Sequence, residues 1–149
     1  MCLNGVLLER MNMEIIETPV LIVGGGPTGL ALASDLTSKG VRSVVVETRT
    51  APTDHPRATL LGSRSMEYFR RLGLDEEIVQ NSLPREHGYR IVFATRLSGK
   101  VLHSHGSASP NDYMAAHREM RTDIPESAWT PYYKVQIGQH ALEPILKRW

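Results

Sequence analysis

The stretch that decides the fold is VLIVGGGPTGLALASDLTSKGVRSVVVETR, which runs from Val20 to Arg49. A continuous apolar run from Pro19 to Val23 opens it, and glycines end that run. A short apolar run of this kind is typical of a strand covered on both faces, as in a parallel sheet. The sequence therefore predicts a buried β-strand directly before the glycines.

After the glycines the apolar residues change to a helical period. They recur at the spacing of one helix face from Pro27 to Lys39, and Gly40 supplies the left-handed residue that ends a helix. Ser43 to Glu47, which contains three consecutive valines, predicts a second buried strand. Two parallel strands joined by a helix require a right-handed crossover. We therefore predict an α/β fold with a Rossmann-like βαβ unit of parallel strands, and an incomplete sheet because only these two parallel strands are recognisable.

The spacing of the glycines has a chemical reason. Gly24 permits the tight turn off the strand, Gly26 lets a pyrophosphate approach the backbone, and Gly29 lets the helix pack closely on the sheet. The helix begins at Pro27 and Thr28, where the positive end of its dipole faces phosphates. We predict that these residues bind the phosphates of a dinucleotide.

Glu47 stands at the end of the second predicted strand, about 20 residues after the glycines. From there its carboxylate can accept hydrogen bonds from an adenosine ribose; a plain solvent-facing strand end is the alternative. The carboxylate would repel a 2′-phosphate, which disfavours NADP, although Arg49 nearby reduces that repulsion. Glu47 and Arg49 thus join the predicted site, and the ligand is an ADP-containing dinucleotide.

The composition is that of an ordinary globular chain of 149 residues, 41% hydrophobic and 22% charged. A formal net charge of +1 gives no electrostatic reason to expect nucleic acid, and no apolar run approaches the length of a membrane span. The single cysteine, Cys2, excludes an internal disulfide and favours a reducing compartment, so we expect a cytoplasmic protein. Residues 1–17 lack the apolar region of a signal peptide and are expected to form a flexible leader.

Beyond a proline-bearing loop at residues 48–57, the pattern predicts an additional hairpin and further helices. The expected elements are a helix from Arg64 to Leu72 ended by Gly73, a short helix capped by Asp75, a hairpin of YRIVFA and KVLHSH, a short strand from Tyr132 to Val135, and a last helix from Gln139 to Trp149. Residues 106–131 are polar and contain prolines, so we expect little regular structure there. Pro144 lacks an amide hydrogen, so the last helix should begin late or bend. The side chains expected in the core are Met66, Phe69, Leu72, Leu142 and Leu146.

Four other polar positions carry weaker signals. His103 and His105 share a face of a predicted strand and could chelate a metal, but no third ligand is evident nearby, so we predict no metal site. Ser104 beside them lacks the glycine frame of a nucleophile elbow. His55 either lines the cofactor cleft or faces solvent. No catalytic acid–base pair can be named.

Three segments together resemble a known family. LIVGGGPTGLALASDLTSKGVRSVVVE, HPRATLLGSRSMEYFRRLGL and YYKVQIGQHALEPIL, in that order, resemble the amino-terminal part of the class A flavoprotein monooxygenases. Phenol hydroxylase and para-hydroxybenzoate hydroxylase typify these aromatic hydroxylases. The resemblance extends from Pro19 to Leu146, apart from residues 85–131.

The resemblance implies that the dinucleotide is FAD, and it adds two residues to the predicted site. Arg57, in HPRA, matches an arginine near the phosphate and ribityl region of the flavin, where a guanidinium fork can hold oxygen pairs. Gln139, in GQHALEPIL, matches a glutamine that hydrogen-bonds the flavin side of the cofactor. Judged without the resemblance, Arg57 could equally be a solvated loop residue, and Gln139 a residue that caps a helix.

The reaction implied by the resemblance belongs to a larger enzyme. NADH or NADPH reduces FAD, the reduced flavin traps oxygen as a C4a-hydroperoxide, and this species hydroxylates a small phenol-like aromatic substrate. That chemistry needs a second flavin-binding segment and a substrate domain, which these residues do not supply. We therefore expect residues 18–149 to be the truncated amino-terminal part of an FAD-binding domain, inactive alone, whose apolar surface self-associates or docks with the carboxy-terminal part.

Two alternative functions stay open at this point. The chain could be the NAD-binding domain of a dehydrogenase, although the HPRA and GQHALEPIL segments argue against that. It could also be a non-catalytic nucleotide-binding or interaction module from a truncated paralogue.

Overall fold

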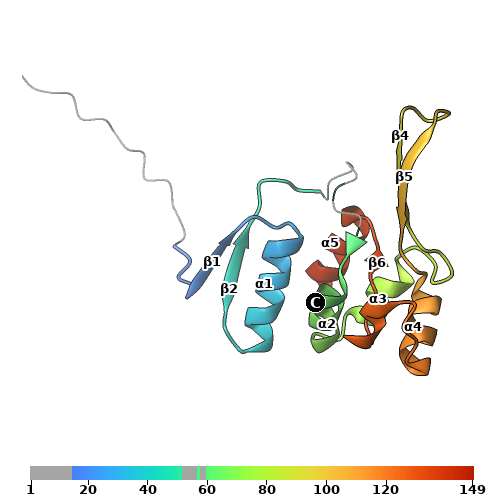
Figure 1. Cartoon of the computed structure of the whole chain (residues 1–149). Helices are drawn as coiled ribbons and strands as arrows, with labels where there is room; N and C mark the ends of the chain where they lie inside the picture. The colour runs from blue at the N-terminus through green and yellow to red at the C-terminus, as the bar shows by residue number, and fades with distance from the viewer. Residues whose placement is uncertain (1–14, 52–56, 58–59) are drawn as a thin grey trace, which may run out of the picture.

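The computed structural model describes residues 15–51, 57 and 60–149, and Figure 1 shows the arrangement of its elements. Their order is β1 (Val20–Val23), α1 (Pro27–Ser38), β2 (Ser43–Val46), β3 (Leu60–Leu61), α2 (Ser63–Arg71), α3 (Asp75–Gln80), β4 (Arg90–Ala94), β5 (Val101–Gly106), α4 (Pro110–Glu119), the 3-10 helix η1 (Pro125–Ala128), β6 (Val135–Gln136) and α5 (Gln139–Arg148).

The predicted βαβ unit is present at the start of this order. β1 and β2 pair in parallel, with Val20 opposite Ser43 and Val23 opposite Val46. α1 connects the two strands, and the chain leaves the helix through Gly40, whose φ of 72° is the expected left-handed conformation. The α/β class and the parallel pairing are therefore confirmed.

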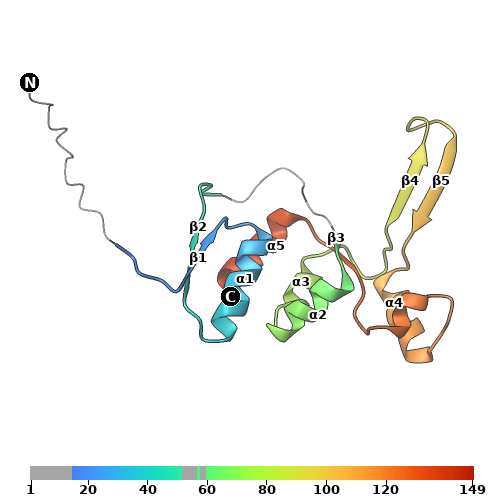
Figure 2. The ribbon, with the colours of Figure 1, turned by 60° about the vertical axis from the view of Figure 1, so that its left-hand side comes forward.

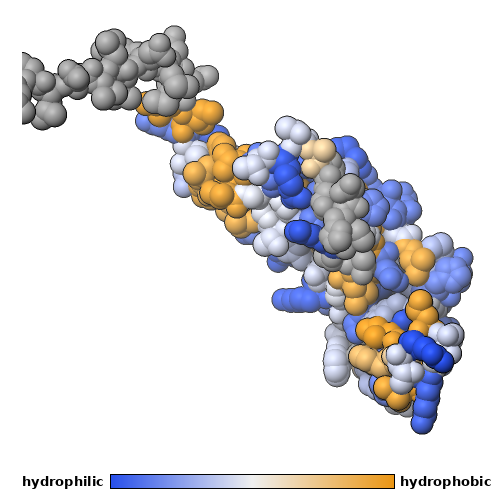
Figure 3. Space-filling model, turned by 90° about the horizontal axis from the view of Figure 1, so that it is seen from above, coloured by the Kyte–Doolittle hydropathy of each residue, from blue (hydrophilic) through white to orange (hydrophobic). Residues whose placement is uncertain are grey.

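The two strands are not covered on both faces, which corrects the prediction of buried strands. Ile22 is 6% exposed and lies on the face that α1 covers, whereas Leu21 and Val23 on the other face are 59% and 82% exposed. Val46, opposite Val23 on that outer face, is also exposed. Seen from above in Figure 3, apolar surface adjoins the grey atoms at this end of the molecule. Among the described residues, the side chains of Leu21, Val23 and Val46 on the outer face are thus left open to solvent.

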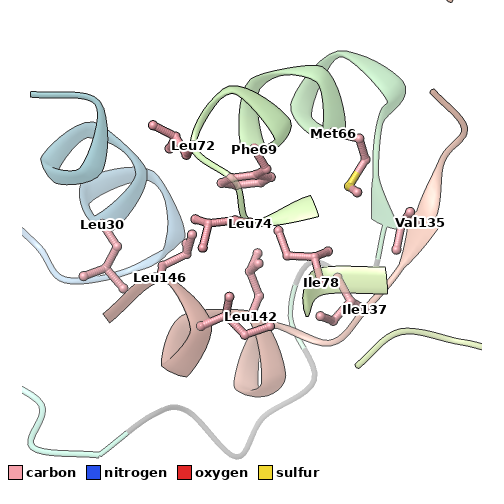
Figure 4. Packing of buried hydrophobic residues seen from close by; sticks show 11 residues of the cluster. Leu30, Met66, Phe69, Leu72, Leu74, Ile78, Val135, Ile137, Leu142 and Leu146 are labelled. Atoms are coloured by element: carbon pink, nitrogen blue, oxygen red, sulfur yellow. The ribbon is translucent and has the colours of Figure 1, made fainter. Parts of the chain in front are cut away.

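The hydrophobic core lies between the helices, as Figure 4 shows. It joins one residue of α1 to side chains from α2, α3 and α5 and from the segments around them, and all five predicted core residues belong to it. The buried members are Leu30, Met66, Phe69, Leu72, Leu74, Ile78, Val135, Ile137, Leu142, Ile145 and Leu146. Because α5 comes from the far end of the sequence, its packing closes the βαβ unit onto the rest of the chain.

A short antiparallel ladder joins the segment before α2 to the segment before α5. β3 pairs with β6, with Leu60 opposite Gln136 and Leu61 opposite Val135. The strand expected from Tyr132 to Val135 is thus shifted toward the C-terminus, and β3 was missed because two residues are too few to show a periodicity.

The predicted hairpin is confirmed and extends away from the body (Figure 2). β4 and β5 pair antiparallel with an irregularity between Phe93 and Ala94. Every residue of both strands is exposed, Phe93 at 55% and Leu102 at 64%.

Residues 106–131 contain more regular structure than expected. Ser109 caps α4, because its hydroxyl oxygen accepts the N–H of Asp112 at 3.2 Å, and Pro110 occupies the first turn, where its missing donor costs nothing. Met120, in the left-handed conformation with a φ of 51°, ends the helix. The expectation of little regular structure in residues 106–131 is therefore wrong, and Ser109–Pro110 is a helix start.

Two helix ends also differ from expectation. Asp75 is the first residue of α3, and Leu74 holds the N-cap position. α5 begins at Gln139 despite Pro144, so the expected late start is wrong. The carbonyl of Gly138 accepts the N–H groups of Ala141 and Leu142 at 3.0 and 3.1 Å, and these bonds close the first turn before the proline is reached. Gly73, with a φ of 72°, follows α2 as predicted.

None of the helices within residues 15–51, 57 and 60–149 is both long and apolar enough to cross a membrane.

Candidate cofactor-binding site

The glycine turn after β1 is tied to the end of β2 by two main-chain donors. Gly24 has a φ of 110°, which favours glycine, and its N–H donates to the carbonyl of Val46 at 2.8 Å. The next N–H, that of Gly25, donates to Oε2 of Glu47 at 2.8 Å. The turn is therefore held in one position relative to both strands.

Gly29 and Gly26 differ in what an added side chain would meet. A Cβ on Gly29 would lie 2.0 Å from the carbonyl oxygen of Gly24, so only glycine allows α1 to come this close to the turn. A Cβ on Gly26, the N-cap of α1, would meet nothing within 4 Å. No protein atom fills the space that a side chain of Gly26 would occupy. The missing side chain therefore leaves room for a phosphate group to approach the backbone.

Both oxygens of the Glu47 carboxylate accept hydrogen bonds from main-chain N–H groups. Oε1 accepts the N–H of Arg49 at 2.9 Å, and Oε2 accepts that of Gly25. The hydrogen bond from the Arg49 backbone, then that from Gly25, and then the Arg49 side chain lower the pKa of Glu47 to about 2. Glu47 is thus a fixed anion at neutral pH, with lone pairs left for a ribose hydroxyl.

The remaining predicted residues near the turn lie where the sequence analysis placed them. Nε of Arg49 is 3.5 Å from Oε1 of Glu47, so the arginine partly neutralises the acid. Pro27 is the first residue of α1. Thr28 follows it, and both line an open hollow together with Gly24, Gly26 and Gly29.

Arg57 and Gln139, which are far apart in the sequence, are brought together. The N–H of Gln139 donates to the carbonyl oxygen of Arg57 at 3.4 Å. Arg57 is exposed and Gln139 is 8% exposed. Gln139 is the first residue of α5 and not its cap, since Gly138 holds the N-cap position.

The two helices behind these residues start at the same edge of the molecule. In Figures 1 and 2, α1 and α5 both begin at the upper edge, and α1 begins beside the ends of β1 and β2. The predicted site residues at the glycine turn, at the end of β2 and at the start of α5 therefore share one edge. Two helix N-termini add positive potential there, which favours an anionic ligand.

Two residues of this edge were missed by the sequence analysis. Gly25 is absent from the predicted residues, although its N–H donates to the carboxylate of Glu47. Glu143 was passed over in the last helix; it is 1% exposed, and its Oε1 accepts the side-chain Nε2 of Gln139 at 2.6 Å. The signal was present, because Gln139 and Glu143 are four residues apart and so lie on one helix face.

The weaker candidates do not join this site. His103 and His105 lie on the exposed β5 strand, where the ring of His103 is 6.1 Å from that of Phe93. No group of three or more histidine, cysteine or acidic side chains suited to a metal occurs among the residues that the structure describes. His55 lies outside them.

Comparisons with known proteins agree with this geometry. A family model described as an FAD binding domain matches residues 17–149. The FAD-dependent monooxygenase apdD of Emericella nidulans is 34% identical over 130 residues, which are 86% of this chain and 20% of that protein. The phenol 2-monooxygenase of Pseudomonas sp. is 28% identical over 123 residues, 79% of this chain and 20% of the relative.

A solved structure extends the likeness to three dimensions. The flavin-dependent monooxygenase PieE, in complex with FAD and substrate, matches with a TM-score of 0.70 and 31% identity over 89% of this chain and 22% of PieE. The chain thus spans about a fifth of the length of these proteins. The resemblance to the amino-terminal portion of the aromatic flavoprotein monooxygenases is confirmed, and the chain belongs to the FAD binding domain family.

Proposed function

We propose that this chain binds FAD along the edge formed by the glycine turn, Glu47, Arg57 and the start of α5. The observation that carries the proposal is the open N-cap at Gly26, set between a fixed anion at Glu47 and a helix N-terminus. An ADP moiety needs these three features together: a ribose acceptor, a phosphate approach and a positive helix end.

Each predicted residue then has a role in holding the cofactor. Glu47 accepts from the adenosine ribose, while Arg49 offsets part of its charge. The pyrophosphate lies against Gly24, Gly26 and Gly29, with Pro27 and Thr28 at the positive end of α1. The residues proposed to bind the ADP half of the cofactor are therefore Gly24, Gly26, Pro27, Thr28, Gly29, Glu47 and Arg49.

The flavin side of the cofactor points toward Arg57 and Gln139. The guanidinium of Arg57 is exposed and free to hold oxygen pairs of the phosphate and ribityl region. Gln139 supplies amide hydrogen bonds from the start of α5. A main-chain hydrogen bond joins these two residues.

For the whole protein we propose NAD(P)H-dependent hydroxylation of a small aromatic substrate, in a reducing compartment such as the cytoplasm. Bound FAD supplies the redox chemistry, because it takes electrons from NADH or NADPH and activates dioxygen. The described residues bind and orient the cofactor. Residues 18–149 are then the amino-terminal part of the FAD-binding domain, preceded by a leader at residues 1–17, and the chain alone is inactive.

The outer face of the β1–β2 sheet has a role in the same proposal. Its exposed apolar side chains are suited to contact with further chain or with a second copy, because parallel sheets are normally covered on both faces. We propose that this chain self-associates or docks with the carboxy-terminal part of the whole protein through this face.

The experiment that tests cofactor binding compares FAD, ADP and NAD⁺ on the purified chain of 149 residues. Isothermal titration calorimetry should give binding of ADP and tighter binding of FAD, since only FAD reaches Arg57 and Gln139. NAD⁺ should bind no more tightly than ADP. Tighter binding of NAD⁺ than of FAD would favour a dehydrogenase domain and contradict the proposal.

A further inference from the structure

Glu143 occupies an unusual position for an acidic residue. It is 1% exposed, and among the described residues it is the only acidic or basic side chain that is buried. Its neighbours in α5, Leu142 and Leu146, belong to the hydrophobic core. Replacing a buried ionic group by an apolar side chain of similar size is often neutral or stabilising, so packing alone does not account for a glutamate here.

The partner of Glu143 is the side-chain amide of Gln139, one helical turn earlier. Nε2 donates to Oε1 of Glu143 at 2.6 Å. A carboxylate offers only acceptors, whereas an amide has one acceptor oxygen and two N–H donors. The bond therefore selects one of the two orientations of the amide and leaves its oxygen and second N–H directed elsewhere.

Gln139 is thus fixed at two points. Its backbone N–H is bound to the carbonyl of Arg57, and its side-chain Nε2 is bound to Glu143. The backbone bond satisfies an amide donor of the first turn that Gly138, the N-cap without a capping side chain, cannot satisfy. The side-chain bond to Glu143 has no part in capping. An amide held in this way presents a preset pattern of acceptor and donor at the start of α5.

We propose that Glu143 is a positioning residue that orients the amide of Gln139 toward the flavin side of the cofactor. The inference rests on the proposed FAD site and adds a residue to it that does not touch the cofactor. Preorganisation of this kind lowers the cost of ordering a polar side chain on binding. Removal of the carboxylate should therefore weaken FAD binding through Gln139 alone.

The test uses Glu143→Gln, which keeps the size of the side chain. Because a glutamine can either accept from or donate to Gln139, this variant allows both amide orientations. Glu86→Gln, on an exposed acid, is the matched control. Dissociation constants for FAD and for ADP are measured by calorimetry on the full chain, together with the midpoint of thermal unfolding.

We expect Glu143→Gln to raise the dissociation constant for FAD by about 10-fold, the value of one hydrogen bond of ~1.4 kcal/mol, and to leave that for ADP within about twofold. ADP serves as the internal reference because it ends before the flavin side. An equal loss for FAD and ADP, or a loss for neither, would overturn the inference.

A double-mutant cycle separates positioning from a general effect on the fold. In a Gln139→Ala background, Glu143→Gln should cause no further loss of FAD affinity relative to ADP. A further loss as large as in the wild-type background would show that Glu143 does not act through Gln139. Wild-type chain that binds FAD no better than ADP would overturn the proposed flavin-side contacts and this inference together, whereas tighter binding of FAD that Glu143→Gln leaves unchanged overturns the inference alone.

Discussion

The N–H of Gly25 donates a 2.8 Å hydrogen bond to Oε2 of Glu47 and so joins the turn after β1 to the end of β2. A Cβ on Gly25 would lie 3.0 Å from the Cβ of Glu47, which shows how closely the two segments approach. The acid at the end of β2 is therefore part of the structure of the glycine turn before any ligand arrives. We therefore expect both the stability of the fold and the proposed binding of FAD to depend on it.

The first prediction separates two glycines of the same motif. Gly29→Ala should lower the free energy of unfolding by at least about 2 kcal/mol, because the new methyl group meets the Gly24 carbonyl at 2.0 Å. Gly26→Ala should change stability by less than about 0.5 kcal/mol, since its methyl meets no protein atom within 4 Å. Urea unfolding of both variants measures the difference.

The second of these variants also tests the phosphate approach. Gly26→Ala should fold normally and bind FAD and ADP more weakly, because the methyl group occupies the proposed phosphate position. Unchanged affinity for both ligands in Gly26→Ala would place the pyrophosphate elsewhere.

The second prediction concerns the pH dependence of stability. The pKa of Glu47 is about 2 in the folded chain, against an ordinary value of 4.5. A group whose pKa is lowered by folding stabilises the fold fully above its unfolded pKa and loses that contribution as the pH falls through the folded value. The contribution of Glu47 should therefore disappear between pH 4.5 and pH 2.

Glu47→Gln is the variant that measures this contribution. Other carboxyl groups with lowered pKa values, Glu67 and Asp123, titrate in both proteins, so their effects cancel in the difference. The gap in unfolding free energy between the wild type and Glu47→Gln should be constant above about pH 5 and shrink toward pH 2. A gap that does not depend on pH would contradict the assigned hydrogen bonds.

The third prediction distinguishes charge from geometry at Arg57. Arg57→Ala should weaken FAD binding by about 10-fold, the value of one charge-assisted hydrogen bond. Arg57→Lys should recover only part of the loss, because an ammonium group cannot hold two oxygens as a planar fork does. Arg96→Ala, in the hairpin connection, is the control, and fluorescence quenching of FAD gives the affinities. Full recovery by lysine would mean that only charge matters at this position.

The fourth prediction addresses the contact between α1 and α2. The hydroxyl of Tyr68 donates to the carbonyl of Ala31 at 2.6 Å in a partly buried position. Tyr68→Phe should lower the unfolding free energy by about 1 kcal/mol, since one partly buried hydrogen bond is lost while the ring is kept. Thermal unfolding checks this value. A variant as stable as the wild type would show that water replaces the tyrosine hydroxyl at no cost.

The fifth prediction tests the outer face of the β1–β2 sheet. The chain should self-associate with increasing concentration in sedimentation experiments, because Leu21 and Val23 expose apolar surface there. Leu21→Lys should reduce that association. Leu97→Lys, in the hairpin connection, is the control, since Leu97 is fully exposed outside this face. Wild-type chain that stays monomeric at high concentration would contradict the proposed role of the face.

Local sequence determined the βαβ unit and most helix positions. The apolar run before Gly24, the helical period after it and the left-handed ends at Gly40 and Gly73 are properties of neighbouring residues, so they can be read without knowledge of the fold. The same holds for Glu47, because one helix and one strand separate it from the glycines and both are predictable from local sequence. The start of α4 was missed because Ser109–Pro110 signals a turn as well as a helix start.

Only the tertiary structure decided what lies beside the glycine turn. The bond between Arg57 and Gln139 and the burial of Glu143 depend on how α5 packs on α1, and no local pattern encodes a contact across 82 residues. The exposed outer face of β1 and β2 likewise depends on packing, because an apolar run indicates that a strand can be buried but not which element covers it. The sequence by itself therefore determined the elements and the chemical character of the site, whereas long-range packing decided which side chains meet there.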